Sequence, residues 1–257
     1  MSAPLLRVEA VSKLYDGQIG CADVSLELDE AEVLAVVGES GSGKSTLLNL
    51  LGGALPTTSG TIHYRCKDGA WIDVARASEP ELRRLQRQEW GHVRQNPRDG
   101  LRMNVSAGGN VGEPLMTNGM RHYGRIRAES AAWMQRVELD PQRMDQRPGV
   151  FSGGMQQRVQ IARNLITRPR LVFMDEPTGG LDVSVQARLL DLIRDLVNEL
   201  GVAVILVTHD LAVARLLADR MIVMRQGRIV ETGLCDQVLD DPQDAYTQLL
   251  VSSIVHA

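Results

Sequence analysis

A glycine-rich segment between a strand-like run and a helix-like run is the feature that most limits the folds open to this chain. The segment Gly38–Ser45, GESGSGKS, follows the apolar run Val33–Val37 and precedes the helical pattern LLNLLGG. Glycines let the backbone wrap closely around an anion, and the N–H groups at the start of a helix point at it. The spacing G-x-x-x-x-G-K-[ST] in this strand-to-helix context predicts a phosphate-binding loop on an α/β core.

The side chains of this loop suggest their own roles. Lys44 would supply positive charge to the phosphates, and the Ser45 hydroxyl would be a ligand for Mg²⁺. The alternative, a glycine-rich turn with a solvated lysine, is disfavoured by the strand and helix patterns on either side. We expect the nucleotide-binding residues of this segment to be Gly38, Ser40, Gly41, Gly43, Lys44, Ser45 and Thr46.

Short apolar runs that alternate with helical patterns indicate a mostly parallel core sheet covered by helices. Leu171–Met174 and Val202–Val207 are apolar throughout, as strands buried on both faces require. Between them, residues 182–201 have an amphipathic helical pattern in which Asp182 is the N-cap and Gly201 ends the helix. The expected buried face consists of Val185, Leu189, Ile193, Leu196 and Leu200.

The ends and the middle of the chain depart from this alternation. Residues 5–17 with 23–32, and residues 220–233, have the pattern of short antiparallel strands with glycine turns, which predicts a β-rich layer beside the core. From Asn96 to Gly149 the buried-strand signal disappears, and helical patches predict an inserted helical subdomain. The expected organisation is a single domain over 1–257, with 1–95 and 168–257 as core and β layer and 96–167 as the helical subdomain.

Two adjacent carboxylates follow the run Leu171–Met174. Asp175 ends a buried strand, where α/β sheets place their ligands, and could hold Mg²⁺ directly or through water. Glu176 lies beside this metal ligand with no metal of its own to neutralise, and could deprotonate the water that attacks a γ-phosphate. The alternative is that Asp-Glu-Pro only closes a strand, and the pair alone does not decide.

Three single residues give weaker signals. His209 follows Val202–Val207 and is expected at the same sheet edge as Asp175, where it could bind a γ-phosphate, although a lone histidine is more often a surface or packing residue. Gln95 follows a possible strand, GHVRQ, and could reach Mg²⁺ or water. Tyr15 precedes the phosphate loop and could either stack on adenine or pack in the core.

Charge and cysteine content exclude several classes of protein. A net charge of -4 and a pI near 5.8 lack the basic footprint of a nucleic-acid binder. The three cysteines are widely separated, which favours reduced thiols over a disulfide framework or a zinc site. No cationic leader precedes an apolar run, and no stretch approaches the ~18 apolar residues of a membrane span. We expect a cytoplasmic chain, peripheral to the inner membrane if it docks to a permease, with no nucleic-acid partner.

A second candidate anion site lies at Phe151–Arg158, FSGGMQQR, where a serine and two glycines open a polar helical stretch. Such a start presents a nest of backbone donors. The phosphate loop, this segment, LVFMDEP, GGLD and THD occur in that order, and the set resembles the nucleotide-binding domain of ATP-binding-cassette proteins over nearly the whole chain. The resemblance implies a P-loop α/β fold and an ATPase that uses ATP and Mg²⁺.

The resemblance also implies that this second anion site acts on the ATP bound by another subunit. Ser152, Gly153 and Gly154 would complete in trans the ATP site of an opposing cassette, so the working unit would be a head-to-tail dimer, most simply of two copies of this chain. Two departures stand out. Phe151 and Met155 replace the usual leucine and glutamine of this signature, and GGLD replaces the commoner SALD.

Three further roles are implied by the same resemblance. Gln95 would be the lid-loop glutamine that links the site to a partner, His209 the switch histidine, and Asp182 the dimer-contact aspartate. Arg98, Arg102 and Met103 follow Gln95, where such proteins receive partners, and could be docking residues. The alternative for this stretch is a flexible surface connection.

Longer blocks resemble particular branches of the family. Residues 241–250, DPQDAYTQLL, resemble the ATP subunits of oligopeptide importers. Residues 89–116, 122–130, 151–197 and 246–254 resemble more closely the ATP-binding subunits of carbon–phosphorus lyase systems, which degrade phosphonates and have a soluble multisubunit core. This implies an ATPase that drives conformational change in lyase core subunits. The alternative is the ATPase of a phosphonate or oligopeptide importer, while a cassette acting on DNA or ribosomes is disfavoured by the acidic charge.

Overall fold

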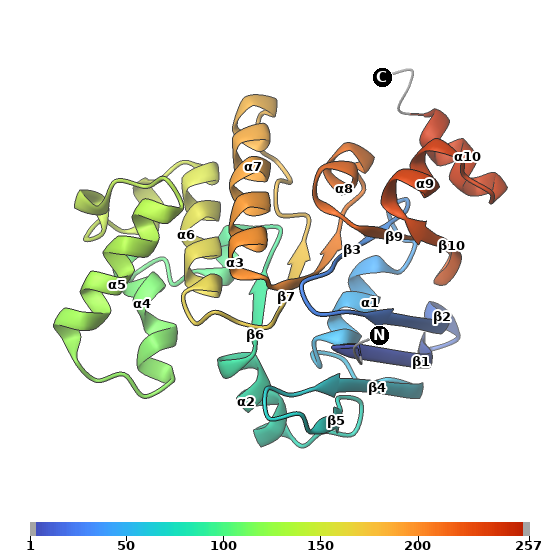
Figure 1. Cartoon of the computed structure of the whole chain (residues 1–257), viewed down its shortest axis with the longest axis horizontal. Helices are drawn as coiled ribbons and strands as arrows, with labels where there is room; N and C mark the ends of the chain where they lie inside the picture. The colour runs from blue at the N-terminus through green and yellow to red at the C-terminus, as the bar shows by residue number, and fades with distance from the viewer. Residues whose placement is uncertain (1–3, 254–257) are drawn as a thin grey trace. The chain divides into compact units, whose positions relative to one another are not determined.

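The computed structural model describes residues 4–253, which form two compact units (Figure 1). The first unit contains the chain up to Leu82 and again from Ala203, and the second contains Arg83–Val202. Helix α2, Glu79–Gln88, carries the chain from the first unit into the second, and begins with a capping box in which Glu81 accepts hydrogen bonds from the Ser78 amide and hydroxyl.

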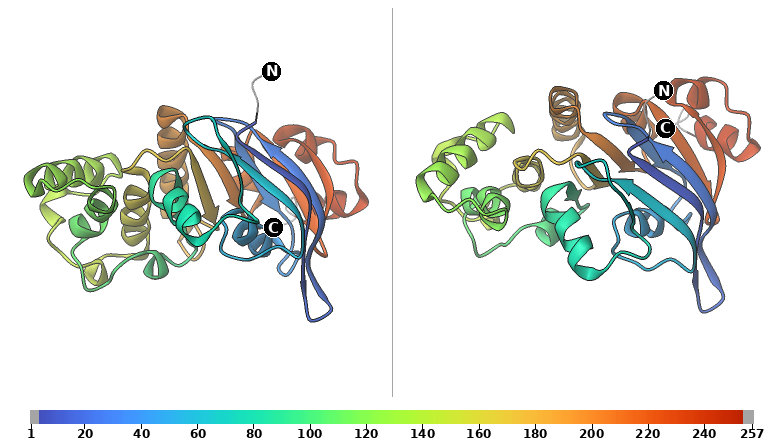
Figure 2. Two further views of the ribbon diagram at one scale, coloured as in Figure 1. Left: turned by 90° about the horizontal axis from the view of Figure 1, so that it is seen from below. Right: turned by 60° about the horizontal axis from the view of Figure 1, so that its bottom comes forward.

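The first unit contains an antiparallel sheet with the strand order β2-β1-β4-β5, and its long strands run side by side in both views of Figure 2. The strands are β1 Leu6–Tyr15, β2 Gln18–Leu28, β4 Ser59–Arg65 and β5 Trp71–Asp73. The antiparallel pairing of the first two strands is as predicted. The last two strands were not expected from the sequence.

The same unit contains parallel strands that carry the phosphate loop. Strand β3, Val33–Val37, lies between β8, Ala203–Val207, and β9, Arg220–Arg225, and is parallel to both. Strand β10, Arg228–Leu234, continues antiparallel from β9. The prediction that residues 220–233 lie in the β-rich layer is therefore wrong, because β9 pairs with β3 of the core.

Helices of the first unit cover these strands. They are α1 Lys44–Leu51, α8 Leu211–Leu217, α9 Cys235–Asp240 and α10 Ala245–Ser252. Alternate residues of β3 and β9, such as Ala35 and Met221, pack with Leu211 of α8, Val238 of α9 and Tyr246 of α10 in one apolar cluster. The C-terminal helices are thereby fixed against the strand that leads into the phosphate loop.

The second unit combines one parallel strand pair with helices. Strand β6, Trp90–Val93, is parallel to β7, Leu171–Asp175. Its helices are α3 Pro97–Gly100, α4 Ala107–Thr117, α5 Tyr123–Arg136, η1 Pro141–Arg143, η2 Pro148–Val150, α6 Gly153–Leu165 and α7 Val183–Leu200. No strand occurs between residues 96 and 149, as the sequence pattern indicates. The boundaries of a helical subdomain at 96–167 stay a prediction.

Helix α7 begins and ends where the sequence predicts, but its buried face is rotated. Asp182 caps the first turn, and Gly201 adopts a left-handed conformation after the last. Of the predicted apolar face, Val185 and Leu200 are only half-buried. The buried residues include Leu190, Leu192 and Val197 in addition to those predicted correctly, Leu189, Ile193 and Leu196.

Two expectations about special segments can be compared with the described residues. Cys21, Cys66 and Cys235 are free and buried, as expected for reduced thiols. Burial is the main cause that raises the pKa of Cys235 to about 11, so its thiol stays protonated at neutral pH. Among residues 4–253, no helix combines the length and the apolar character needed to span a bilayer.

Candidate functional site

The phosphate loop has the local structure that its sequence predicts, running from the end of β3 to the start of α1. Two of its glycines are needed for close approach. A Cβ atom on Gly38 (φ 145°) would lie 2.2 Å from the Met224 carbonyl oxygen, and one on Gly43 (φ 103°) would lie 2.4 Å from the Gly20 carbonyl oxygen. These two positions exclude other residues, and they place the loop against β9 and β2.

Lys44 is the buried cation of this loop, with its side chain folded back over the loop's own backbone. Its Nζ donates to the carbonyl oxygens of Gly38 at 2.7 Å and Glu39 at 2.8 Å, and the residue is only 6% exposed. Ser45 follows at the exposed start of α1, and Thr46 is half-buried. The ammonium group is therefore held at the centre of the loop, where phosphate oxygens would meet it.

A residue that sequence reasoning missed supports the loop from the C-terminal helices. The Tyr246 hydroxyl accepts a hydrogen bond of 3.1 Å from the Glu39 amide, while its ring lies beneath the Arg225 guanidinium at 4.8 Å. Tyr246 is 6% exposed. The sequence signal, a tyrosine in the stretch 241–250, was interpreted only as a family likeness, because nothing local connects it to a loop some two hundred residues earlier.

Tyr15 lies next to the phosphate loop, as adenine stacking requires. A Cβ atom placed on Gly20 would lie 2.6 Å from Cε2 of Tyr15 and 3.0 Å from Cγ2 of Thr46, so both side chains pack on Gly20. The Tyr15 ring is 41% exposed, with Lys13 Nζ 5.3 Å from its centroid. A partly exposed ring at this place is accessible to a base.

His209 follows β8 in the first unit, as predicted. It is exposed, and it lies between Thr208, whose hydroxyl accepts the Asp210 amide at 3.0 Å, and Asp210, which caps α8. The strands β3 and β8 are parallel, so His209 and the phosphate loop leave the carboxyl ends of neighbouring strands.

The second unit brings Gln95 and Glu176 together. Nε2 of Gln95 donates to a carboxylate oxygen of Glu176 at 2.9 Å, and Asp175 ends β7 immediately before it. Glu176 has a φ of 42°, a conformation that is uncommon for residues other than glycine and that tends to persist at functional sites. The predicted base and the predicted lid-loop glutamine are therefore neighbours.

The predicted signature opens α6. Ser152 is the N-cap, and its hydroxyl accepts a long hydrogen bond of 3.4 Å from the Met155 amide. Ser152 and Gly153 are exposed, whereas Gly154 is buried against Val185 of α7. The exposed N-terminus of this 13-residue helix, at Ser152 and Gly153, presents backbone donors and the positive end of the helix dipole.

Asp182 caps α7 close to this signature. Its carboxylate accepts the Val185 amide at 3.0 Å and the Ser184 hydroxyl at 2.8 Å, and these hydrogen bonds lower the pKa of Asp182 below its usual value.

A cavity of about 450 Å³ is lined by Gln95, Gly153 and Gly179 among others. Within the second unit, the lid glutamine, the signature and the GGLD segment therefore share one surface depression.

Glutamines of α6 hold the segment before Gln95, and sequence reasoning did not find them. Gln160 accepts the Arg94 amide at 2.7 Å and donates to the Arg94 carbonyl at 3.1 Å, and Gln157 donates to that same carbonyl at 3.3 Å. Both glutamines are at most 2% exposed. The helix that begins with the signature is thus bonded directly to the residue that precedes Gln95.

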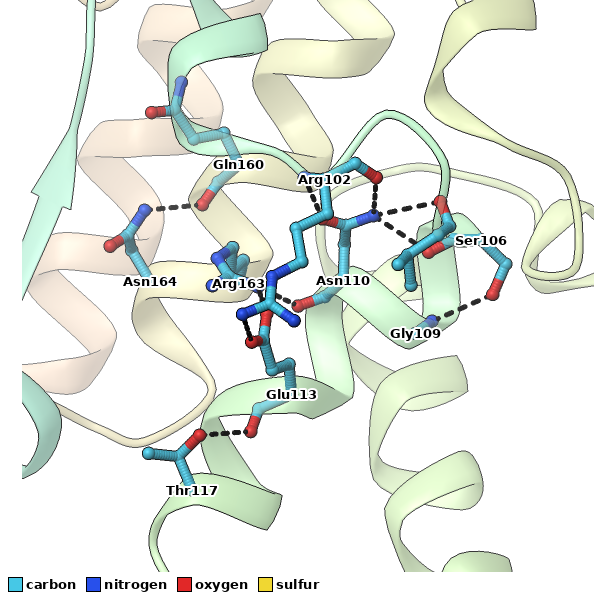
Figure 3. Close-up of polar contacts among 10 residues, drawn as sticks. Arg102, Ser106, Gly109, Asn110, Glu113, Thr117, Gln160, Arg163 and Asn164 are labelled. Carbon is cyan, nitrogen blue, oxygen red and sulfur yellow. Dashed lines mark hydrogen bonds and ion pairs between the residues drawn. The ribbon is translucent and has the colours of Figure 1, made fainter.

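The expected docking segment after Gln95 is held by a polar network (Figure 3). The Asn110 side chain accepts the Arg102 amide at 2.7 Å and donates to the carbonyl oxygens of Arg102 and Val105 at 3.0 and 3.1 Å. The Glu113 carboxylate bridges Arg102 at 2.6 Å and Arg163 at 2.5 Å. These contacts favour an ordered segment over a flexible connection, and the charge of Arg102 is already engaged.

The predicted site residues divide between the two units. Tyr15, the phosphate loop and His209 belong to the first, while Gln95, Asp175, Glu176, the signature and Asp182 belong to the second. The predicted metal ligands, Ser45, Gln95 and Asp175, offer a hydroxyl, an amide and a carboxylate oxygen, a donor set that fits Mg²⁺. Among the described residues no cluster of three or more His, Cys, Asp or Glu side chains forms a metal site.

The sequence is similar to those of known proteins. Residues 21–179 match the family model described as ABC transporter. The chain is 59% identical over 255 residues to a putative phosphonates utilization ATP-binding protein, PhnK, of Escherichia coli K12, covering 99% of both chains. It is 39% identical to the dipeptide transport ATP-binding protein DppF of the same strain, covering 95% of this chain and 70% of that protein.

Solved structures agree as well. The ATP-binding cassette MJ0796 in a dimeric post-hydrolysis state with ADP and Pi matches with a TM-score of 0.79 and 29% identity, covering 90% of this chain and 98% of that one. A cassette of Clostridium perfringens, cbiO1, matches with a TM-score of 0.82 and 28% identity over 99% and 98% of the two chains. The chain therefore belongs to the ABC transporter family and is an ATPase of the ATP-binding-cassette type.

Proposed function

We propose that this ATPase hydrolyses ATP at sites shared by two cassettes arranged head to tail, each most simply a copy of this chain. The observation that carries the proposal is that two separate helices begin with segments suited to bind an anion. One is the start of α1 with Gly43 and Lys44, and the other is the start of α6 with Ser152. One nucleotide per chain uses the first nest, and the second faces the γ-phosphate bound by the partner.

The roles of the remaining site residues follow from their chemistry. Tyr15 stacks on the adenine, and Glu176 accepts the proton of the attacking water while Gln95 orients it. His209 binds the γ-phosphate, and Asp182 contacts the second cassette. Mg²⁺, held by Ser45, Asp175 and Gln95, would neutralise charge on the phosphates.

The first nest is tested by the Lys44→Ala variant, with Lys67→Ala as the control for loss of a surface lysine. The affinity for a fluorescent ATP analogue should fall at least tenfold in Lys44→Ala, because a charge-assisted contact with phosphate is lost. Lys67→Ala should bind like the parent chain. Unchanged affinity in Lys44→Ala would remove the phosphate loop from nucleotide binding.

We further propose that the cassette serves phosphonate catabolism as a subunit associated with a carbon–phosphorus lyase core. The 59% identity to a phosphonates utilization protein over the full chain favours this assignment. The alternative, the ATPase of a phosphonate or oligopeptide importer, is favoured by the 39% identity to a dipeptide transport protein. In the first case ATP closure of the pair drives a change in a soluble complex, and in the second it drives a permease.

Affinity capture of the Glu176→Gln variant with ATP distinguishes the two cases. We expect soluble lyase subunits among the proteins identified by mass spectrometry from the soluble fraction. Recovery of an integral membrane permease from the detergent extract instead would favour the importer.

The Arg98→Glu variant tests the docking surface, because Arg98 is exposed, and Arg121→Glu is its matched control. Partner binding that survives Arg98→Glu would place the interface elsewhere.

A further inference from the structure

Arg143 contacts both residues at which this chain departs from the usual signature. Its guanidinium carbon lies 4.6 Å from the centroid of the Phe151 ring, and its Nη1 donates to Sδ of Met155 at 3.5 Å. Its Nε donates to the side-chain oxygen of Gln146 at 2.8 Å. One cation thus contacts the residue before Ser152 and the residue in the first turn after it.

The segment that carries Arg143 is itself anchored. The Gln146 carbonyl accepts the Ala107 amide and the Met144 carbonyl accepts the Gly108 amide, each at 2.8 Å, at the start of α4. The Arg143 amide bonds to the Asp140 carbonyl at 3.0 Å within the turn of η1. Because the backbone around Arg143 is held by these hydrogen bonds, the position from which its side chain extends is fixed.

The signature needs such support, because its own cap is weak. The Ser152 hydroxyl accepts the Met155 amide at 3.4 Å, whereas the Asp182 cap of α7 is bonded at 3.0 Å. The Phe151 carbonyl accepts Nε2 of Gln156 at 3.0 Å, which fixes the backbone but not the ring. Arg143 fixes the ring and the Met155 side chain, so the conformation of Ser152 is set from both flanks.

The chemistry of the two departures matches an arginine. A guanidinium is attracted by the face of an aromatic ring and can donate to a thioether. A leucine at position 151 would offer no π-face, and a glutamine at position 155 would offer an amide oxygen in place of the thioether. Arg143, Ser152, Gly154 and Met155 also line one cavity of about 390 Å³. The Arg143 side chain therefore faces the same cavity as Ser152 and Gly154.

We propose that Arg143 is a positioning residue for the signature, and that its contacts with Phe151 and Met155 preorganise Ser152 and the Gly153 and Gly154 amides for the γ-phosphate of a second cassette. The inference rests on the proposed function of the nest. It assigns Arg143 no contact with the nucleotide. Its effect should appear when two cassettes close and not when one cassette binds ATP.

The test uses Arg143→Met, which keeps the apolar stem on Phe151 and removes every N–H donor. The background is Glu176→Gln, in which ATP-dependent dimers accumulate, and the readout is the dimer dissociation constant from sedimentation velocity. We expect Arg143→Met to raise this constant about five- to tenfold, from the loss of a cation–π and a sulfur contact. ATP affinity of the monomer and the melting temperature should stay as in the parent.

The control is Arg147→Met, which removes the same charge four residues away from a side chain with no hydrogen bond or ion pair to residues 4–253. It should leave the constant unchanged. A second background, Phe151→Leu with Met155→Leu, separates positioning from general charge effects. Because neither leucine offers Arg143 a π-face or a hydrogen-bond acceptor, Arg143→Met should change the constant less than about twofold there.

Each other outcome contradicts the inference in a distinguishable way. An unchanged dimer constant in Arg143→Met, or an equal loss in both signature backgrounds, would show that Arg143 does not act through Phe151 and Met155. Loss of monomer ATP affinity together with thermal stability would reduce Arg143 to a structural role. Failure of the Glu176→Gln parent to dimerise would instead remove the proposed function of the nest, on which the inference rests.

Discussion

Glu176 combines a left-handed backbone conformation with a side chain that is already bonded to Gln95. Such a conformation costs free energy in a residue other than glycine, and it persists where neighbouring structure determines it. Here the Glu176 carbonyl accepts the Gly179 amide at 2.9 Å, so the turn into the GGLD segment fixes it. The backbone conformation therefore sets the direction of the Glu176 carboxylate, and the side-chain amide of the exposed Gln95 donates a hydrogen bond to it.

Tyr246 provides the first prediction at this scale. Replacing Tyr246 by Phe removes only the hydroxyl that accepts the Glu39 amide. A hydrogen bond of this kind contributes about 0.5–1.5 kcal/mol net, so ATP affinity should fall about two- to tenfold as the loop loses its support. Titration with a fluorescent ATP analogue measures the change, and Tyr123→Phe, at an exposed tyrosine, is the control. Equal affinities for both variants would show that the hydroxyl does not support the loop.

His92 provides a prediction about pH. Burial, and secondarily the Arg94 charge, lowers the pKa of His92 to about 4, and the imidazole is stacked on Phe173 at 4.9 Å. As the pH falls below 6.5, His92 is protonated in the unfolded chain but stays neutral in the folded chain. The free energy of unfolding therefore decreases as the pH falls from 6.5 toward 4. The loss from this group should be on the order of 1–3 kcal/mol.

Chemical denaturation at several pH values measures this loss. His92→Leu should flatten the decline in unfolding free energy between pH 6.5 and 4, the interval set by the shifted pKa. His63→Leu, which removes a histidine from β4 of the other unit, is the matched control. Parallel declines in His92→Leu and the parent chain would contradict a neutral, buried His92.

At the scale of elements, α6 does more than present the signature. Its buried glutamines hold both carbonyl and amide of Arg94, and Asn164 accepts the His92 amide at 2.8 Å. The same helix also holds the Phe151 carbonyl through Gln156. Signature and lid glutamine are therefore attached to one rigid helix, and a displacement of one should displace the other.

Gln160→Leu tests this coupling. The variant removes the acceptor of the Arg94 amide and one of the two donors to the Arg94 carbonyl, which should cost about 1–3 kcal/mol of stability. Because Arg94 precedes Gln95, the kcat for ATP hydrolysis should fall further than the KM for ATP rises. Gln135→Leu, at an exposed glutamine of α5, is the control. A loss of stability with unchanged kcat would show that Gln160 is structural only.

The elements also show where sequence reasoning succeeds. The strand, loop and helix around Gly38–Ser45 were predicted because all of their determinants are adjacent in the chain. The two ends of α7 were predicted for the same reason, since Asp182 and Gly201 act locally. The buried face of α7 was misjudged, because which side is covered depends on the neighbours it packs against.

At the scale of the whole molecule, the features that the sequence did not predict share one cause. Strand β9 pairs with β3, which precedes it by more than 180 residues, and no local pattern encodes this partner. The bond between Tyr246 and Glu39 joins positions 207 apart, and the bonds between Gln160 and Arg94 join positions 66 apart. The family order of motifs predicted the residues of the nucleotide site, but the residues that support these segments became visible only through long-range contacts.

The central claim concerns two cassettes and is tested most directly by the oligomeric state. The measurement is sedimentation velocity of Glu176→Gln with and without ATP and Mg²⁺, alongside the double variant with Lys44→Ala. We expect monomers without nucleotide, dimers with ATP, and monomers at all times for the double variant, because only the ATP-bound form is stabilised in the closed pair. A Glu176→Gln chain that binds ATP yet stays monomeric, or that hydrolyses ATP at the parent rate, would contradict the account.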